Sequence, residues 1–260
     1  MVGISETLAP NRFLAGLRAG VPQIGCWASL MAHYATEILG GAGFDWVLLD
    51  MEHAPNELHT ILPQLQVMER YDGTALVRPP WNDTVILKKL LDAGTRGFLI
   101  PMVQSAEEAR AAVAAVRYPP RGVRGVSGST RANQFGRIKD YFDRIEEETA
   151  LLVQAETLAA LEVVEDIASV DGVDGVFFGP ADIAADMGYL GQPMAEAVWE
   201  KILPAAQKVM DLGVPVGTLV FDPTFAKTLI DRGFTFVATG SDVSLLTSGA
   251  DRLAKEMADR

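Results

Sequence analysis

The sequence predicts an α/β fold, specifically a closed (β/α)8 TIM barrel that forms a single domain over residues 1–260. Short apolar segments alternate eight times with segments that have the apolar spacing of helices, which is typical of a parallel sheet covered by helices. The length of 260 residues is close to the roughly 250 of such a barrel. No linker, change in composition or repeat divides the chain, so we expect no second domain.

Turn residues mark the limits of the elements in the first half of the chain. Residues 46–49, Trp-Val-Leu-Leu, show the strand pattern, an apolar run without a polar break. Gly40 and Gly41 end the preceding helix, and Pro79-Pro80 stops the third strand because proline donates no hydrogen bond within a sheet. The elements expected here are a short helix over 11–19, strands over 24–28, 46–49, 74–77 and 97–100, and helices over 32–41, 57–70, 83–93 and 105–117.

The second half opens with the longest predicted loop, residues 118–134, which is rich in glycine and proline. Its arginines, Arg121, Arg124 and Arg131, are candidates for binding an anionic substrate tail, although such charges are more often solvated or bridge subunits. The elements expected beyond it are a charged helix over 138–148, strands over 151–155, 176–178, 214–220 and 234–238, and helices over 158–168, 196–212, 223–232 and a last one ending near 257.

The composition narrows the class of partner. A net charge of -12 argues against nucleic acid and membrane surfaces as partners, since both attract clustered Lys and Arg. The sequence shows no signal peptide, and no apolar run approaches the roughly 18 residues of a membrane helix. The one cysteine, Cys26, cannot form an internal disulfide, so we expect a cytoplasmic enzyme with a small-molecule substrate.

Polar residues gather where the predicted strands end, and in such a barrel these positions form the mouth that binds ligands. Asp50, Glu52 and His53 directly follow the second strand. The other residues expected at the mouth are Trp27, Ser29, Arg78, Gln154, Glu156, Asp182, Thr218, Gly240, Ser241 and Asp242.

Two carboxylates at the mouth predict a metal site. Glu156 and Asp182 follow consecutive strands, so their side chains should be neighbours, and two close carboxylates need a proton or a cation between them. An all-oxygen pair with room for water suits Mg²⁺ or Mn²⁺ better than zinc. The structural alternative is that Glu156 is a charge at a helix N-terminus and Asp182 the N-cap of a short helix.

His53 is the candidate general base, because Asp50 and Glu52 are within reach to orient its ring and raise its basicity. A lone histidine is often only structural, and His33 and His59 fall within predicted helices and are interpreted in that way.

Arg78 ends the third strand and should point inward to meet a ligand oxygen or a carboxylate. Gln154 precedes Glu156 by two residues, so both side chains should face the interior of the barrel, where Gln154 is either a hydrogen-bond donor of the site or a satisfied core amide. The turn Gly179-Pro180-Ala181-Asp182 can present backbone N–H groups to a carboxylate, although the motif is short.

These motifs, taken together and in order, resemble the metal-dependent pyruvate aldolases of the HpcH/HpaI family. The likeness covers nearly the whole chain. The motifs that carry it are D-x-E-H-x-P at 50–55, L-V-R-P at 76–79, P-M-V-Q-S-A-E-E-A-R at 101–110, R-Y-P-P-R-G-V-R-G at 117–125, L-L-V-Q-A-E-T at 151–157, G-V-D-G-V-F-F-G-P-A-D at 172–182 and D-M-G-Y at 186–189.

The resemblance implies a barrel enzyme, usually a hexamer whose last helix is exchanged between subunits. It implies a class II aldolase, a carbon-carbon lyase that cleaves 4-hydroxy-2-oxo acids reversibly into pyruvate, or hydroxypyruvate, and an aldehyde. The implied cofactor is a divalent cation, Mg²⁺ or Mn²⁺, with Co²⁺ as a further candidate.

The family's residue roles carry over to matching positions. Glu156 and Asp182 would hold the cation, His53 would be the base, and Arg78 would contact the keto oxygen. The remaining matches are Gln154 lining the donor pocket, Gly179, Pro180, Ala181 and Asp182 receiving the donor carboxylate, Asp50 orienting His53, and Asp92 joining that network across a subunit contact.

The chain departs from the family at two places. Relatives commonly have a larger apolar residue at Ala155, but its side chain should point away from the lumen and affect packing only. The stretch 127–133 matches no particular activity, which leaves the aldehyde undefined.

Other functions remain open at this point. A related barrel lyase or decarboxylase, or a phosphoenolpyruvate-type enzyme, would use the same 2-oxo acid enolate, but no phosphate loop is visible. An aldolase with a Schiff-base lysine is disfavoured because all lysines fall in predicted helices. A non-catalytic metabolite-binding barrel is the alternative outside the enzymes.

Overall fold

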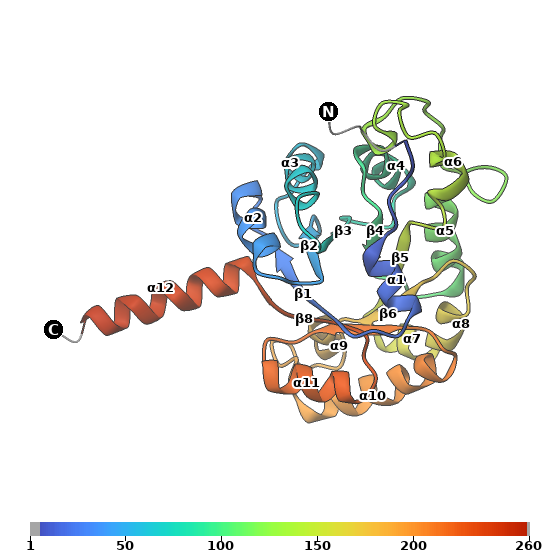
Figure 1. Cartoon of the computed structure of the whole chain (residues 1–260). Helices are drawn as coiled ribbons and strands as arrows, with labels where there is room; N and C mark the ends of the chain where they lie inside the picture. The colour runs from blue at the N-terminus through green and yellow to red at the C-terminus, as the bar shows by residue number, and fades with distance from the viewer. Residues whose placement is uncertain (1–5, 259–260) are drawn as a thin grey trace.

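The computed structural model describes residues 6–258, which contain a closed barrel of eight parallel strands paired in sequence order, with β8 returning to β1 (Figure 1). This confirms the predicted fold class. The strands are β1 (Gln23–Ala28), β2 (Trp46–Asp50), β3 (Thr74–Arg78), β4 (Gly97–Ile100), β5 (Ala150–Ala155), β6 (Gly175–Phe178), β7 (Val216–Leu219) and β8 (Phe236–Ser241).

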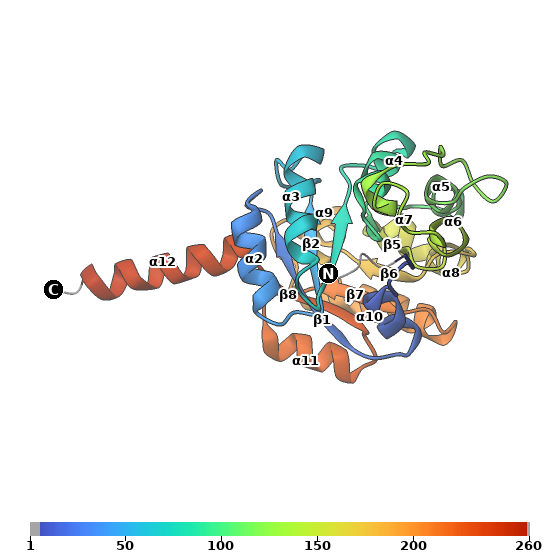
Figure 2. The same ribbon diagram turned by 45° about the horizontal axis from the view of Figure 1, so that its top comes forward.

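Helices surround the barrel, and most lie where the apolar spacing predicted them (Figures 1 and 2). They are α1 (Arg12–Arg18), α2 (His33–Gly41), α3 (Leu58–Met68), α4 (Thr84–Ala93), α5 (Ala106–Val116), α6 (Tyr141–Arg144), α7 (Leu158–Glu162), α8 (Val164–Ala168), α9 (Pro180–Asp186), α10 (Glu196–Asp211), α11 (Pro223–Asp231) and α12 (Asp242–Ala258), with a 3₁₀ turn at η1 (Arg131–Asn133).

Two predicted helices are wrong in extent. The helix expected over 138–148 shrinks to α6, because the Glu146 carboxylate accepts the Tyr118 N–H at 2.7 Å and ties this segment to the end of α5. The helix expected over 158–168 is broken at Val163, whose backbone angles (φ -113, ψ 18) lie outside the helical region and separate α7 from α8.

The lumen of the barrel is filled by aromatic rings below the mouth. Trp27 and Trp46 lie 5.9 Å apart between ring centroids, and Trp27 lies 5.6 Å from Phe177. Glycines make room for these rings, since a Cβ on Gly25 would lie 2.1 Å from Trp46 and one on Gly217 2.3 Å from Phe236. The rings form an apolar floor, which leaves the ends of the strands as the accessible part of the lumen.

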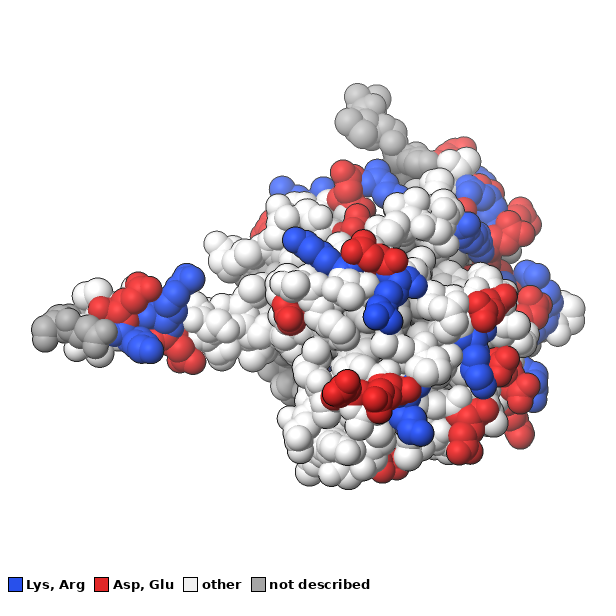
Figure 3. Space-filling model, turned by 90° about the horizontal axis from the view of Figure 1, so that it is seen from below, with Lys and Arg blue, Asp and Glu red and all other residues white. Residues whose placement is uncertain are grey.

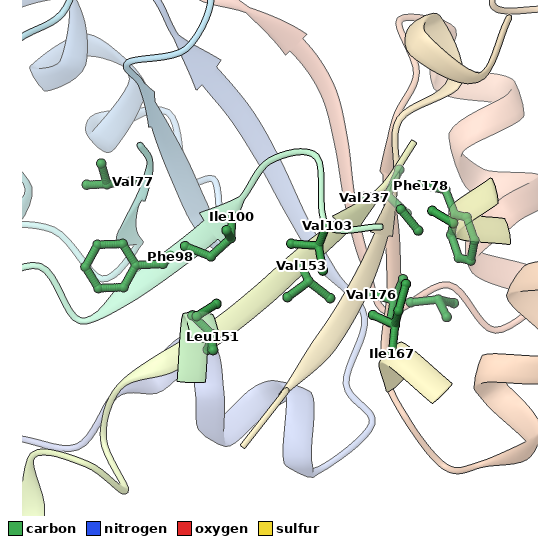
Figure 4. Packing of buried hydrophobic residues seen from close by; sticks show 14 of the residues in the cluster. Val77, Phe98, Ile100, Val103, Leu151, Val153, Ile167, Val176, Phe178 and Val237 are labelled. Carbon is green, nitrogen blue, oxygen red and sulfur yellow. The ribbon is translucent and has the colours of Figure 1, made fainter. Parts of the chain in front are cut away.

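A second apolar layer lies between the strands and the helices. Its members alternate with lumen residues along the strands, and Figure 4 shows Val153, Val176 and Val237 among them. Ala155 belongs to this layer and is fully buried. The prediction that its side chain faces away from the lumen is therefore confirmed.

Helix α12 points away from the barrel in both ribbon views (Figures 1 and 2). Its first residue anchors it, because the Asp242 carboxylate accepts the N–H groups of Ser29 at 2.9 Å and Leu30 at 3.0 Å. Asp242 is the one residue of α12 that is buried. Among the described residues, no helix is both long and apolar enough to cross a membrane.

Candidate active site

The turn after β2 brings three functional side chains to the mouth. Asp50 ends the strand, and buried Asn56 fixes the turn by donating from Nδ2 to the Asp50 carbonyl oxygen at 2.7 Å. The Glu52 N–H donates to Asp50 Oδ1 at 3.1 Å, which holds Glu52 close behind the strand end. The turn is thus fixed at both ends before any ligand binds.

Arg78 lies at the centre of this cluster, as β2 and β3 pair with Asp50 directly opposite it. Its Nε and Nη2 atoms each donate to one Asp50 oxygen at 2.8 Å, a bidentate arrangement, and Nη1 lies 2.8 Å from Glu52 Oε2. The guanidinium also faces the Trp27 ring at 5.6 Å. Burial opposes its charge, but the hydrogen bonds and charges of Asp50 outweigh burial, and the pKa of Arg78 is raised.

His53 lies at the rim, with 65% of its side chain exposed. The acid near it is Glu52, whose Oε2 atom is 3.9 Å from His53 Nε2. Both Asp50 oxygens are engaged by Arg78, and no direct contact joins Asp50 to His53 in the described part of the chain. The expectation that Asp50 orients His53 directly is corrected, because Arg78 occupies the Asp50 carboxylate.

Glu156 is the buried carboxylate of the site, and both of its oxygens are held. Gln154 Nε2 donates to Oε2 at 2.8 Å, and the Met102 N–H donates to Oε1 at 2.7 Å. Burial raises the pKa of Glu156 to about 7, and the charges of Glu52 and Asp182 raise it further against the hydrogen bond from Met102. Both oxygens thus accept from groups outside α7, whose N-cap is Thr157, so the carboxylate makes no hydrogen bond to that helix end.

Asp182 lies in the first turn of α9, beside Glu156. Gly179, the N-cap of α9, packs against Glu156 so closely that a Cβ would lie 2.5 Å from Glu156 Oε2. Because Gly179 is the N-cap of α9, the alternative that Asp182 is the N-cap of this helix is wrong. Pro180 occupies the first helical position and is buried, whereas Ala181 and Asp182 are exposed.

The charge balance of these residues fits a divalent cation. Four carboxylates, Asp50, Glu52, Glu156 and Asp182, meet one arginine, and Glu52 as well as Glu156 has a raised pKa, first because of burial. Gln154 Oε1 is buried and has no hydrogen-bond partner. Within residues 6–258, no group of three His, Cys, Asp or Glu side chains lies close enough together to hold a metal ion.

The structure does not bring Asp92 to this cluster. Asp92 lies in the last turn of α4 and pairs with Arg124 at 3.3 Å. The other two loop arginines are also paired within the chain, Arg121 with Glu146 and Arg131 with Glu69. All three loop arginines therefore form ion pairs within the chain, and these contacts do not support the prediction that they bind an anionic substrate tail.

The lysines do not enter the site. Lys139 lies outside the predicted helix, in the segment between η1 and α6, and does not follow a strand. The other six lysines fall in helices, as predicted, so none lies at the C-terminal end of a strand. His33 and His59 are exposed within α2 and α3.

Two contacts at the mouth were incompletely predicted. Glu52 was expected to orient His53, but its contact with Arg78 was not foreseen. Met102 gave no signal, because it acts through its backbone, which adopts a left-handed conformation (φ 53) that is uncommon for a residue other than glycine.

Comparison with known proteins gives one consistent result. The model of the family described as HpcH/HpaI aldolase/citrate lyase matches residues 23–249. The chain is 51% identical over 251 residues to a pyruvate aldolase of Rhizobium etli, covering 96% of this chain and 99% of the relative. It is 48% identical over 245 residues to a 4-hydroxy-2-oxo-heptane-1,7-dioate aldolase of Escherichia coli, covering 94% of each. A crystal structure of a family protein from Burkholderia cenocepacia superposes with a TM-score of 0.92 at 33% identity, covering 95% of this chain and 99% of the other.

Proposed function

Because the chain belongs to the HpcH/HpaI aldolase/citrate lyase family, we propose that it is a metal-dependent pyruvate aldolase. It would cleave 4-hydroxy-2-oxo acids reversibly into pyruvate and an aldehyde, the chemistry in the names of relatives that are about half identical to it. The observation that carries the proposal is the buried Glu156 carboxylate beside Asp182, in a mouth where acids outnumber the single arginine.

The metal would be held by Glu156 and Asp182. Mg²⁺ or Mn²⁺, with Co²⁺ as a further candidate, would supply a Lewis acid that draws electrons away from C3 of the 2-oxo acid when bound. The buried Glu156, with both oxygens oriented by neighbours, is suited to keep one fixed geometry.

The chain's own residues then bind the substrate and move the proton. Arg78 would donate a remaining N–H to the keto oxygen and offset the charge that grows there as the C3–C4 bond breaks. In cleavage His53 would take the proton of the 4-hydroxyl group, and the pyruvate enolate would receive a proton at C3. The turn of Gly179, Pro180, Ala181 and Asp182 would seat the donor carboxylate, and Gln154 would line the donor pocket. A hydroxypyruvate donor fits the same scheme, because its extra hydroxyl lies on C3.

The last helix is our candidate for subunit assembly. Leu245, Leu246 and Leu253 of α12 are 57% to 62% exposed, and Tyr34 and Ile38 of the adjacent α2 are 72% and 65% exposed. Figure 3 shows charged side chains near the tip of α12 and uncharged ones nearer the barrel. A second copy of the chain would cover this apolar surface, as in a homo-oligomer, a hexamer by resemblance, with exchanged last helices. In such an assembly Asp92 of a neighbouring copy could support the site.

The test is pyruvate release from a racemic 4-hydroxy-2-oxo acid, with EDTA, after adding back Mg²⁺ or Mn²⁺, and in Glu156→Ala. We expect activity to disappear with EDTA, return with metal and stay below a thousandth of wild type in the variant. The exposed Glu162→Gln is the matched control and should remain active. Turnover that persists in EDTA and in Glu156→Ala would overturn the metal-dependent mechanism.

A further inference from the structure

At the mouth of the barrel, the seam where β8 meets β1 depends on a side chain as well as on backbone pairing. The side chain is Asp242, which directly follows β8. We propose that Asp242 is a positioning residue, whose carboxylate holds the end of β1 against β8 and thereby keeps Trp27 beside Arg78. This inference rests on the proposed aldolase function, in which Arg78 contacts the keto oxygen.

The backbone pairing of this seam is irregular near the mouth. β1 and β8 pair at Gly25 with Ala238 and next at Trp27 with Ser241. One residue of β1 but two residues of β8 lie between these pairs, so β8 bulges and the ladder of hydrogen bonds is interrupted. On its other side, β1 stays in register with β2. The end of β1 is therefore paired regularly toward β2 and irregularly toward β8.

The Asp242 carboxylate supplies hydrogen-bond acceptors directly beyond the bulge. Its Oδ1 atom accepts the Ser29 N–H at 2.9 Å, and its Oδ2 atom accepts the Leu30 N–H at 3.0 Å. Oδ1 also accepts the Val243 N–H at 2.8 Å, which fixes the carboxylate at the start of α12. Burial first, and then the charge of Asp242, raise the pKa of the Cys26 thiol to about 12, as expected for a carboxylate close to β1. Charge-assisted bonds to two successive N–H groups thus join the strands where the ladder is interrupted.

The end of β1 carries the ring that the Arg78 guanidinium faces. The centre of the guanidinium lies 5.6 Å from the centroid of the Trp27 ring, and Trp27 is two residues before Ser29. Asp50 holds Nε and Nη2 of Arg78, and the Trp27 ring is a second support for the same group. A shift of the β1 end would move this ring, and a displacement of about 1 Å at a reacting group can cost about 100-fold in rate.

The alternative is that Asp242 only begins α12 and stabilises the fold as a whole. The proposed metal site separates the two roles, because Glu156 and Asp182 follow β5 and β6. β5 lies four strands from β1 in either direction around the closed barrel. A variant that disturbs only the end of β1 should therefore spare metal binding, whereas a general loss of structure should impair metal binding and turnover together.

The experiment compares Asp242→Asn with Asp231→Asn, the same substitution at an exposed position of α11. Asparagine offers one acceptor oxygen in place of two and turns an N–H donor toward the end of β1. We expect Asp242→Asn to lower kcat for cleavage about 10- to 100-fold, with KM within about threefold. Its affinity for Mn²⁺, measured by isothermal titration of metal-free protein, should stay within about twofold of wild type. Asp231→Asn should match wild type in all three quantities.

Hydrogen–deuterium exchange of wild type tests the seam without any variant. The peptide that contains Ser29 and Leu30 should keep two amides that exchange about 100-fold more slowly than those around the exposed Leu190. In Asp242→Asn these two amides should exchange rapidly.

Three results would overturn the inference: rapid exchange of Ser29 and Leu30 in wild type, wild-type kcat in Asp242→Asn, or a loss of Mn²⁺ affinity in Asp242→Asn as large as its loss of kcat. Wild-type protein that does not cleave the substrate would instead overturn the proposed function, and the exchange of Ser29 and Leu30 would still test the seam.

Discussion

At the scale of single residues, Glu156 links the stability of the protein to its chemistry. Its pKa is raised from 4.5 to about 7, first because of burial, so the folded state holds its proton at pH values where the unfolded chain has released it. The free energy of unfolding that this group contributes is complete below pH 4.5 and is lost as the pH rises through 7. The loss amounts to about 3 kcal/mol at most.

The first prediction follows for metal-free protein. Glu156→Gln should gain stability relative to wild type as the pH rises from 5 to 8, because it has no carboxyl to ionise. Thermal unfolding in EDTA measures the difference in Tm. Mn²⁺ should stabilise wild type and not the variant, and Tm curves that run parallel for both proteins would contradict the role given to this carboxyl.

The second prediction concerns Arg78. Arg78→Lys should lower kcat/KM for cleavage by about 10²- to 10³-fold, because lysine cannot pair with Asp50 through two parallel bonds and still reach Glu52 and the substrate. Arg70→Lys is the matched control, since within residues 6–258 the ion pair of Arg70 is an exposed one with Glu37. Equal losses in the two variants would show that the effect is not specific to the mouth.

Residue type and position at a strand end were enough to predict which polar side chains lie at the mouth of the barrel. Arg78, Gln154, Glu156 and Asp182 all lie at the mouth because parallel strands in a barrel end on one side. The spacing could not tell that the Asp50 carboxylate is used by Arg78, because rotamers depend on the neighbouring strand.

At the scale of elements, the β4–α5 connection holds Glu156 through a backbone conformation. The third prediction is that Met102→Val weakens Mn²⁺ binding about tenfold, since β-branched residues are strained at φ 53 and the N–H bonded to Glu156 would move. Met102→Gly is the matched variant, because glycine adopts this conformation without strain. Isothermal titration of metal-free protein measures both, and similar weakening in both variants would assign the effect to the lost side chain.

The sequence predicted strands better than helices, for a physical reason. The strands are mostly buried on both faces, and the clearest of them, residues 46–49, is an unbroken apolar run. The segment 138–148 has the composition of a helix but forms only the short α6. The hydrogen bond from the Tyr118 N–H to the Glu146 carboxylate limits this helix, and local spacing gives no sign of so long-range a bond.

At the scale of the whole molecule, α12 leaves the barrel with its apolar residues uncovered. The fourth prediction is that Leu246→Asp with Leu253→Asp reduces the proposed oligomer to smaller species and lowers Tm, since charges would replace the apolar contacts proposed between copies. Light scattering after size-exclusion chromatography measures the mass. Lys255→Asp, nearer the charged tip, is the matched control and should keep the wild-type mass. A wild-type protein that elutes as a monomer would contradict the proposed assembly.

The aromatic floor of the lumen also gives the protein an optical property. The indole rings of Trp27 and Trp46 lie 5.9 Å apart at 65°, close and tilted enough for their electronic transitions to couple. Trp27 also faces the Arg78 guanidinium, so a change of charge at the mouth takes place beside a chromophore. The arrival of a 2-oxo acid should therefore alter the intrinsic fluorescence and the circular dichroism of the unlabelled protein.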